Sequence, residues 1–266
     1  MNRQAFIENP APEIQEKLLL AIEDSQAPLV IFDIGACEGE SSIRYARLFP
    51  NAQLYAFEPL PSNMERVQQL LRQYQVTTVS PQALCLSDKA GETKFYVSSG
   101  KPEHAADADW DYGNKSSSIL PPAKTKELHR WLKFEEAITV PTTTLRQFCA
   151  EKNIPRIDFI HMDVQGAELM VLQGAGDFIQ HVNMIWLEVE AVELYKGQPL
   201  KKDVEDFMQQ RGFVKLEDTV YTTAGDQFWV RREYILRKKG KTFLWWRKGF
   251  TFFKFYYKKI RRNLLK

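Results

Sequence analysis

Short apolar runs that alternate with amphipathic stretches constrain the fold of this chain more than any other feature. Residues 29–32 form a fully apolar run that stops at Asp33, and residues 40–49 follow with helical spacing. The same alternation recurs further along the chain. Apolar runs this short are typical of strands that are buried on both faces of a parallel sheet. We therefore predict an α/β fold with a mostly parallel seven-stranded sheet and helices on both faces.

The predicted elements extend to residue 236. Strands are expected at residues 29–32, 53–57, 77–85, 93–97, 157–162, 184–189, 213–216 and 228–236. Helices are expected at residues 13–24, 40–49, 63–74, 143–152, 167–172 and 204–210. Residues 100–122 are rich in Gly, Ser, Pro, Asp and Lys and lack periodicity, which predicts a long surface loop. We divide the chain into an N-terminal helical segment (1–27), one α/β domain (28–236) and a C-terminal helix (237–266).

Composition indicates a globular protein of the cytoplasm. The chain has 266 residues, 44% of them hydrophobic, which is enough for a core without disulfides or metals. Its three cysteines lie far apart and form no CxxC or His/Cys cluster, so we predict no zinc site and no disulfide. Glu8, Glu13 and Glu16 interrupt the stretch that a secretory signal would need, and no apolar run is long enough to span a membrane.

A glycine-containing turn after the first predicted strand is the first candidate ligand site. Residues 32–39 read FDIGACEG, with Gly35 and Gly39 four positions apart. The N–H groups at the start of the following helix favour an anionic or polar ligand. The same pattern also suits an ordinary strand-to-helix turn that needs glycine for geometry alone. It is not the G-x-G-x-x-G fingerprint of dinucleotide-binding proteins, which argues against an NAD-dependent oxidoreductase.

An acid at the end of the second predicted strand supports nucleoside binding. Glu58 lies 25 residues after Asp33. A carboxylate at this position can accept hydrogen bonds from both ribose hydroxyls of an adenosine. A solvent-facing acid at a strand end is the alternative for Glu58 alone, but the glycine turn and Glu58 together favour a nucleoside site.

The third candidate site follows the predicted strand at 157–162. Asp163 stands at its carboxyl end, where open α/β sheets bind ligands. Glu168 would lie in the first turn of the next helix, where the helix dipole alone can explain it. His161 is expected on the opposite face of the strand from Met162, and a packing role is favoured there over a catalytic one.

These motifs together resemble the FkbM family of S-adenosylmethionine-dependent methyltransferases. The matching segments are DIGACEG (33–39), FEP (57–59), LSDKAG (86–91), SSSIL (116–120), TLRQF (144–148) and IDFIHMDVQGAELMVLQGA (157–175). The last segment is long and specific, whereas many methyltransferases share the glycine turn. The resemblance covers roughly residues 28–236 and implies the Rossmann-like class I methyltransferase fold, with S-adenosylmethionine as the cofactor.

The resemblance also implies roles for individual residues. Cofactor binding is expected from Asp33, Gly35, Ala36, Gly39, Glu58, Pro59, Gln82, Ala83 and Asp163. Catalysis is expected from Asp163 and Glu168, and substrate binding from Ser117, Ser118 and Glu190. No metal is predicted, because the acids show no decisive ligand spacing.

Three residues depart from the usual family pattern. Cys37 stands where the family usually has Asn, His161 where it usually has Lys, and Gln165 where it usually has Glu. The first departure bears on a cofactor contact. The other two change the charge beside Asp163.

The predicted activity is methyl transfer to a hydroxyl of a sugar, glycolipid or small metabolite. An alcohol needs a base to remove its proton, and Asp163 is the first candidate, ahead of Glu168, Glu188 and Glu190. The alternative is a non-catalytic nucleoside-binding module that is recruited to a membrane or a partner. Such a module would not need Asp163 and Glu168.

The C-terminal segment is basic and aromatic. Residues 231–266 carry 14 Lys or Arg and one acid; since the formal net charge of the whole chain is +2, residues 1–230 carry −11. One predicted helix face holds Phe243, Trp246, Phe250, Phe253, Tyr257, Ile260 and Leu264. This pattern suits an anionic membrane surface, packing on the domain or on a second copy in a homodimer, or nucleic acid, which the acidic body disfavours. Lipid contact would place the protein on the inner face of the membrane.

Overall fold

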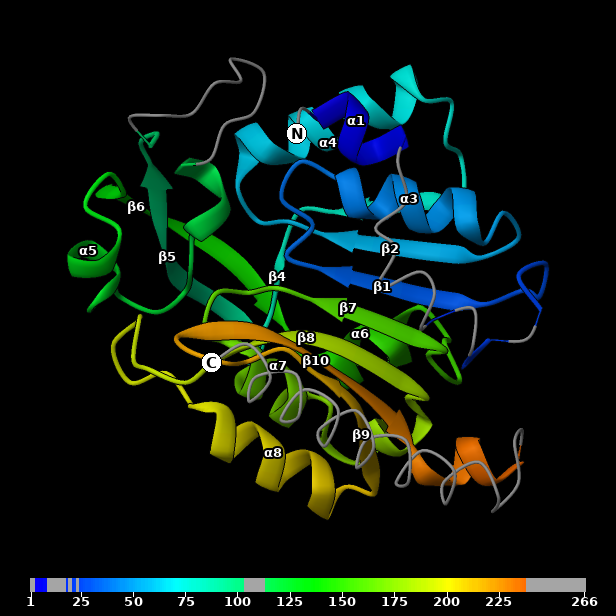
Figure 1. The fold of residues 1–266 in the computed structure, drawn as a ribbon. Coiled ribbons are helices and arrows are strands. Elements are labelled where there is room, and N and C mark those ends of the chain that lie inside the picture. Colours follow the sequence, from blue (N-terminus) through cyan, green and yellow to red (C-terminus); the bar gives the residue numbers. More distant parts are fainter. Residues whose placement is uncertain (1–2, 9–17, 19–20, 23, 103–112, 238–266) are drawn as a thin grey trace, which may run out of the picture.

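A seven-stranded sheet with the order β3-β2-β1-β7-β8-β10-β9 runs through the molecule (Figure 1). The computed structural model describes residues 3–8, 18, 21–22, 24–102 and 113–237. Strands β3, β2, β1, β7 and β8 run parallel, and β10 is antiparallel to β8 and β9. The prediction of a mostly parallel seven-stranded sheet is confirmed. In chain order the strands are β1 (Val30–Ile34), β2 (Gln53–Phe57), β3 (Val79–Gln82), β7 (Phe159–Met162), β8 (Met184–Glu190), β9 (Phe213–Asp218) and β10 (Ala224–Arg231).

Helices cover both faces of this sheet, and each face has its own apolar core. One core includes residues of α1 (Arg3–Glu8), α3 (Glu40–Leu48) and α4 (Pro61–Gln73). The other includes residues of α6 (Leu145–Glu151), α7 (Glu168–Gly174), the 3₁₀ helix η2 (Gly176–His181) and α8 (Lys201–Gln210). Within β1, Ile31 belongs to the first core and Phe32 to the second. This alternation follows from the opposite directions of successive side chains in a strand.

A second, three-stranded sheet lies beside the main one (Figure 1). It has the order β4-β6-β5 and consists of β4 (Cys85–Leu86), β5 (Gly91–Ser99) and β6 (Lys133–Thr143). The sequence predicted most of β5, but it missed β6 and the short helix α5 (Thr125–Leu128). Most of β6 is exposed or half-buried, and it contains Pro141, so it lacks the apolar run that marks the central strands.

The sequence-based prediction differs from the structure at three further places. Strand β10 ends at Arg231, and residues 232–237 are helical rather than extended. The strand ends there because its two partners also end, since Val230 pairs with the first residue of β8 and Arg231 with the first residue of β9. Helix α1 was not predicted. Part of the predicted loop is ordered as the 3₁₀ helix η1 (Gly113–Ser116), followed by a bridge between Ser118 and Tyr96.

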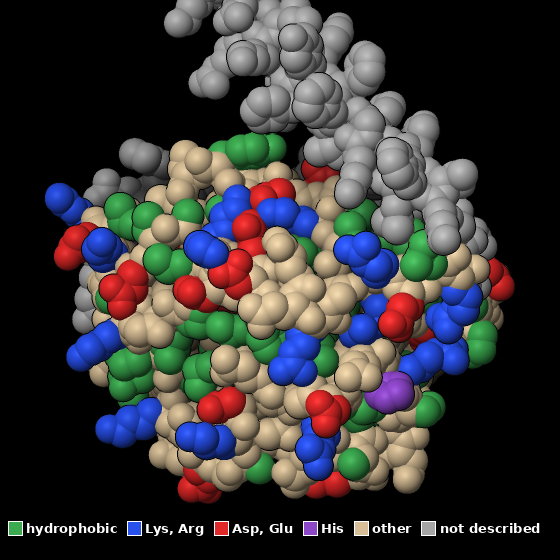
Figure 2. Space-filling view, turned by 90° about the horizontal axis from the view of Figure 1, so that it is seen from below, with side chains coloured by type: hydrophobic (Ala, Val, Ile, Leu, Met, Phe, Trp, Pro, Cys, Tyr) green, Lys and Arg blue, Asp and Glu red, His purple; other side chains and the backbone are tan. Residues whose placement is uncertain are grey.

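Several predictions fall outside the described residues. Most of the predicted helix at 13–24, residues 103–112 of the predicted loop, and residues 238–266 of the C-terminal segment belong to this group. Within the described ranges, no helix combines the length and apolar character needed to cross a membrane. On the face seen from below, acidic and basic side chains of the described residues are interspersed (Figure 2).

Candidate active site

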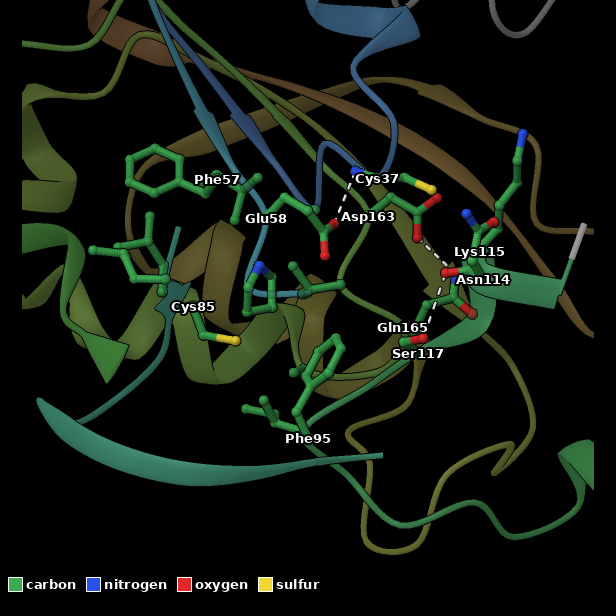
Figure 3. A pocket seen from close by; sticks show the side chains of 18 residues that line it. Cys37, Phe57, Glu58, Cys85, Phe95, Asn114, Lys115, Ser117, Asp163 and Gln165 are labelled. Atoms are coloured by element: carbon green, nitrogen blue, oxygen red, sulfur yellow. Dashed lines mark hydrogen bonds between the residues drawn. The ribbon is translucent and has the colours of Figure 1, made fainter. Parts of the chain in front are cut away.

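A pocket opens at the carboxyl ends of β1, β2 and β7, with residues of β4, β5 and η1 on its other walls. Its two ends differ in character (Figure 3). Phe57, Cys85 and Phe95 lie on one side, whereas Asn114, Lys115 and Gln165 lie on the other, with Glu58 between them. The lining residues are Ile34, Gly35, Cys37, Phe57, Glu58, Pro59, Leu84, Cys85, Leu86, Phe95, Asn114, Lys115, Ser117, Ile119, Asp163, Val164, Gln165 and Ala167.

Glu58 is buried, and the backbone fixes its carboxylate. Oε2 accepts a hydrogen bond from the Cys37 N–H at 3.0 Å, and Oε1 accepts one from the Leu60 N–H at 2.8 Å. Burial raises the pKa of Glu58 to about 8, although these N–H groups act in the opposite direction. Each carboxylate oxygen has a second lone pair, so Glu58 can still accept hydrogen bonds from a ligand in the pocket.

Asp33 lies beneath the glycine turn and is not among the residues that line the pocket. It is fully buried, accepts a hydrogen bond from Ser42 Oγ at 2.5 Å and is hydrogen-bonded to His161 Nδ1 at 2.8 Å. Burial opposes protonation of His161, but the hydrogen bond and the charge of Asp33 outweigh it and raise the pKa of His161. The pair connects β1 to β7 directly under the turn.

Gly35 lines the pocket, and the backbone that follows β7 leaves no room for a side chain at this position. Its φ is +82°, and a Cβ there would lie 1.9 Å from the carbonyl oxygen of Asp163. The N–H groups of Gly35 and Ala36 both donate to the Phe57 carbonyl, at 3.0 and 2.9 Å. Ala36 itself is buried in the core, and Gly39 packs near Val67 of α4. Of the predicted turn residues, the structure therefore brings Gly35 to the pocket and leaves Asp33, Ala36 and Gly39 behind it.

The apolar end of the pocket is shifted along the chain from its predicted position. Pro59 lines the pocket as expected, but Gln82 and Ala83 do not. The wall there is formed by Leu84, Cys85 and Leu86 of β4 and its approach, with Phe95 of β5 opposite. Sequence analysis missed Leu84, Cys85 and Leu86 because the predicted strand at 77–85 is divided into β3 and β4, and it missed Phe95 because that residue reaches the pocket through the second sheet.

Four acids lie close together at the ends of β7 and β8. Asp163 lines the pocket, whereas Glu168 and Glu190 are buried behind it. Glu168 Oε1 accepts hydrogen bonds from the N–H groups of Val164, at 3.0 Å, and Gly166, at 3.4 Å.

Proximity and burial shift the protonation of this acid cluster. Burial, followed by the charge of Glu190, raises the pKa of Glu168. The charge of Asp163, followed by burial, raises the pKa of Glu188. Burial and the charge of Asp163 raise the pKa of Glu190 to about 7. Not all four groups are therefore ionised together at neutral pH.

Residues within the predicted loop at 100–122 complete the polar end of the pocket. Ser117 lines the pocket, whereas Ser118 is buried and donates to the Gln165 carbonyl at 2.8 Å. Asn114 and Lys115 also line the pocket, and Asn114 Nδ2 donates to Glu38 Oε1 at 2.8 Å. Asn114, Lys115 and Gln165 were not among the predicted site residues. The placement of Asn114 and Lys115 depends on how η1 folds over the pocket, and Gln165 lies in the turn after β7.

Cys37, where the resemblance implies Asn, has a backbone conformation that suits that expectation. Its φ is +51°, a left-handed conformation that Asn adopts more readily than most other residues. Burial, followed by the charge of Glu58, raises the pKa of the thiol. The contact that fixes Glu58 comes from the Cys37 backbone, so the substitution leaves that contact in place.

Metal ligation receives no support from the described ranges, in which no group of three or more His, Cys, Asp or Glu side chains could hold a metal ion.

Comparison with known proteins identifies the family. The model of the methyltransferase FkbM domain matches residues 33–215. The 2-O-methyltransferase NoeI of Sinorhizobium fredii is 34% identical over 65% of this chain and 68% of its own length. The hexuronic acid methyltransferase AglP of Haloferax volcanii is 23% identical over 66% of this chain and 62% of its own length.

Among solved structures, the N-terminal domain of EvdMO1 with SAH bound has a TM-score of 0.44 and 12% identity, over 85% of this chain and 81% of that chain. The family match spans the glycine turn, Glu58 and the segment around Asp163. The chain therefore belongs to the FkbM family of S-adenosylmethionine-dependent methyltransferases.

Proposed function

We propose that this enzyme transfers the methyl group of S-adenosylmethionine to a hydroxyl group of a saccharide, with Asp163 as the base. The observation that carries the proposal is the polarity of one pocket. An apolar end, the Glu58 carboxyl group and a polar end with Asp163 and Gln165 follow one another along it (Figure 3).

The residues of the pocket fit the cofactor. Leu84, Cys85 and Phe95 offer an apolar wall for the adenine. Glu58 would accept hydrogen bonds from the ribose hydroxyls, because its oxygens face the pocket and retain acceptor capacity. Asp163 and Gln165 line the polar end, which leaves the methionine portion of the cofactor and the acceptor beside the acid cluster.

When bound, S-adenosylmethionine supplies an electrophilic methyl group, which forms a bond to the acceptor oxygen as its bond to sulfur breaks. The hydroxyl proton must leave in the same reaction, and the Asp163 carboxylate would accept it and release it to water. Glu58 is buried, and that burial would help to exclude water from the part of the pocket that holds the ribose. Alignment of the acceptor oxygen supplies the rest of the catalytic effect.

The names of the relatives support an oxygen acceptor on a sugar. NoeI is a 2-O-methyltransferase, and AglP is a hexuronic acid methyltransferase. Carboxylates are suitable partners for sugar hydroxyls, and the Asp163 carboxyl group lines the pocket. The alternative was a non-catalytic nucleoside-binding module. The chain matches a family of methyltransferases, which does not favour that alternative.

Two conservative substitutions test the proposal. Asp163→Asn should lower turnover of a responsive methyl glycoside by roughly 100-fold or more, because it removes the base. Its affinity for S-adenosylmethionine in calorimetry should stay within a few-fold of that of the native protein. Glu58→Ala should abolish cofactor binding. An Asp163→Asn enzyme with native turnover in a panel of methyl glycosides and glycuronides would refute the assignment of the base.

We further propose that the basic, aromatic segment at residues 241–266 contacts an anionic membrane surface. Its predicted apolar face and its clustered cations support this role. A saccharide attached to a lipid would then be presented to the pocket at that surface.

A further inference from the structure

Gln165 occupies an uncommon backbone conformation at the mouth of the acid cluster. Its φ is +54°, which is rare for a residue other than glycine. The turn that holds it is fixed from both sides. Glu168 accepts the N–H groups of Val164 and Gly166, and Ser118 Oγ donates to the Gln165 carbonyl at 2.8 Å. The backbone therefore aims the Gln165 side chain in one direction.

That side chain connects two acids and a tyrosine. Nε2 donates to Asp163 Oδ1 at 2.6 Å and to Glu188 Oε2 at 2.9 Å. Oε1 accepts a hydrogen bond from the Tyr195 hydroxyl at 2.9 Å. The NH₂ group of the amide thus faces the two acids, and its oxygen faces Tyr195, whose hydroxyl also lies 2.8 Å from the Ser116 carbonyl oxygen.

Within the described ranges, the Gln165 amide is the side chain that donates a hydrogen bond to Asp163. The charge of Asp163 acts on His161, Tyr195, Glu168, Glu188 and Glu190, and it is the largest cause of the raised pKa of Glu188. The amide lies between Asp163 and Glu188, and its bond to Oδ1 fixes the orientation of the Asp163 carboxyl group at the pocket.

We propose that Gln165 is a positioning residue that orients the Asp163 carboxylate and keeps it ready to accept the proton of the acceptor hydroxyl. This inference rests on the proposed role of Asp163. An acid at residue 165 of this chain would face Asp163 and Glu188 at hydrogen-bonding distance, and the three groups would have to share protons.

The test replaces the amide with a carboxylate of the same shape. In Gln165→Glu, the acidic limb of the kcat–pH profile should move to higher pH by about one unit or more, a tenfold loss of turnover on that limb. The substrate would be the methyl glycoside with the highest native turnover. Cofactor affinity should change little. The control is Gln147→Glu, because Gln147 donates to Glu151 in the same way but on the exposed surface of α6.

A second readout needs no acceptor. The introduced acid would bind protons more tightly in the folded state, so the variant should lose melting temperature relative to native protein as pH rises. The difference should shrink as pH falls, and Gln147→Glu should show almost no such trend. If Gln165→Glu fails to fold, Gln165→Met takes its place, and it should lower kcat at least several-fold with KM for the cofactor unchanged.

The outcomes separate this inference from the proposed function. If Asp163→Asn retains native turnover, the assignment of the base fails and Gln165 loses its proposed role with it. If Asp163→Asn is inactive but Gln165→Glu matches native protein in its kcat–pH profile and its melting trend, only the inference about Gln165 fails. Native kcat in Gln165→Met would overturn it in the same way.

Discussion

At the scale of single residues, the environment of Glu58 decides what its carboxylate can do. Its position at the end of β2 is equally typical of an acid that faces solvent. In the folded protein it is buried, and two backbone N–H groups hold it at the pocket. Burial still dominates, so the pKa of Glu58 rises from 4.5 to about 8. The carboxylate is thus preorganised at a cost in stability when it ionises.

This cost predicts a pH-dependent effect of Glu58→Gln. Below about pH 4.5, Glu58 is protonated in both states and its titration contributes no difference. As pH rises toward 8, the unfolded state loses its proton first, so the native protein loses stability that the amide variant does not lose. In chemical denaturation, the free energy of unfolding of the variant should rise relative to that of the native protein by up to about 1.4 kcal/mol per pH unit in this range. A difference independent of pH would contradict the raised pKa.

Other residue roles could be predicted only in part. Glu58 and Asp163 were found because acids at the carboxyl ends of parallel strands lie at one edge of the sheet, here after β2 and β7 on either side of β1. Asp33 has the same kind of position, but its side chain points to the α3 face, where it contacts Ser42 and His161. The direction of a side chain after a strand end depends on local backbone angles, which a motif does not specify.

At the scale of elements, the contact between β1 and β7 shapes the pocket. The two strands pair in parallel from Ile31 to Ile34, and the turn after β1 packs directly on the backbone after β7. A side chain at residue 35 would push these segments apart. The glycine therefore serves the packing of two strands, in addition to lining the pocket.

We expect Gly35→Ala to destabilise the fold by more than about 2 kcal/mol, because it adds both a strained φ and a backbone clash. Gly197→Ala is the matched control, since Gly197 has a φ of +74° but nothing within 4 Å of its Cβ position. Only the strain should remain there, at about 1 kcal/mol. Urea unfolding of both variants measures the difference, and equal losses would mean that the clash is absorbed without cost.

Strand β6 of the three-stranded sheet could not be predicted from the sequence. Strand β6 buries Val140 and Thr143 but leaves most of its length exposed or half-buried. Periodicity reports burial, so a strand that is mainly exposed gives a weak signal. Its pairing with β4 and β5 nevertheless positions Cys85 and Phe95 at the pocket, and no local pattern announces that role.

At the scale of the whole molecule, charge is distributed unevenly along the sequence. The described face in Figure 2 carries both signs, whereas residues 231–266 carry 14 Lys or Arg and one acid. The predicted apolar face of the C-terminal segment places aromatic side chains beside these cations. The division at residues 28 and 237 remains a prediction, as does the membrane contact.

That contact predicts co-sedimentation of the full chain with vesicles that contain phosphatidylglycerol, and weaker binding as salt is added. Serine at Trp246, Phe250 and Phe253 should reduce binding, because it removes the predicted apolar face. The control places serine at Phe252 and Phe255, which lie on the opposite side of the predicted helix. Equal binding by the two variants and the native chain would exclude insertion of this face into lipid.

The sequence by itself determined the class of fold and the order of the central strands in the chain, because buried strands appear as short apolar runs. It also determined Glu58 and Asp163, because each acid directly follows such a run. It also carried the family resemblance. Only the tertiary structure decided which residues line the pocket. Gln165, Lys115 and Phe95 come from a turn, a 3₁₀ helix and the second sheet, and their approach depends on packing between segments far apart in the chain.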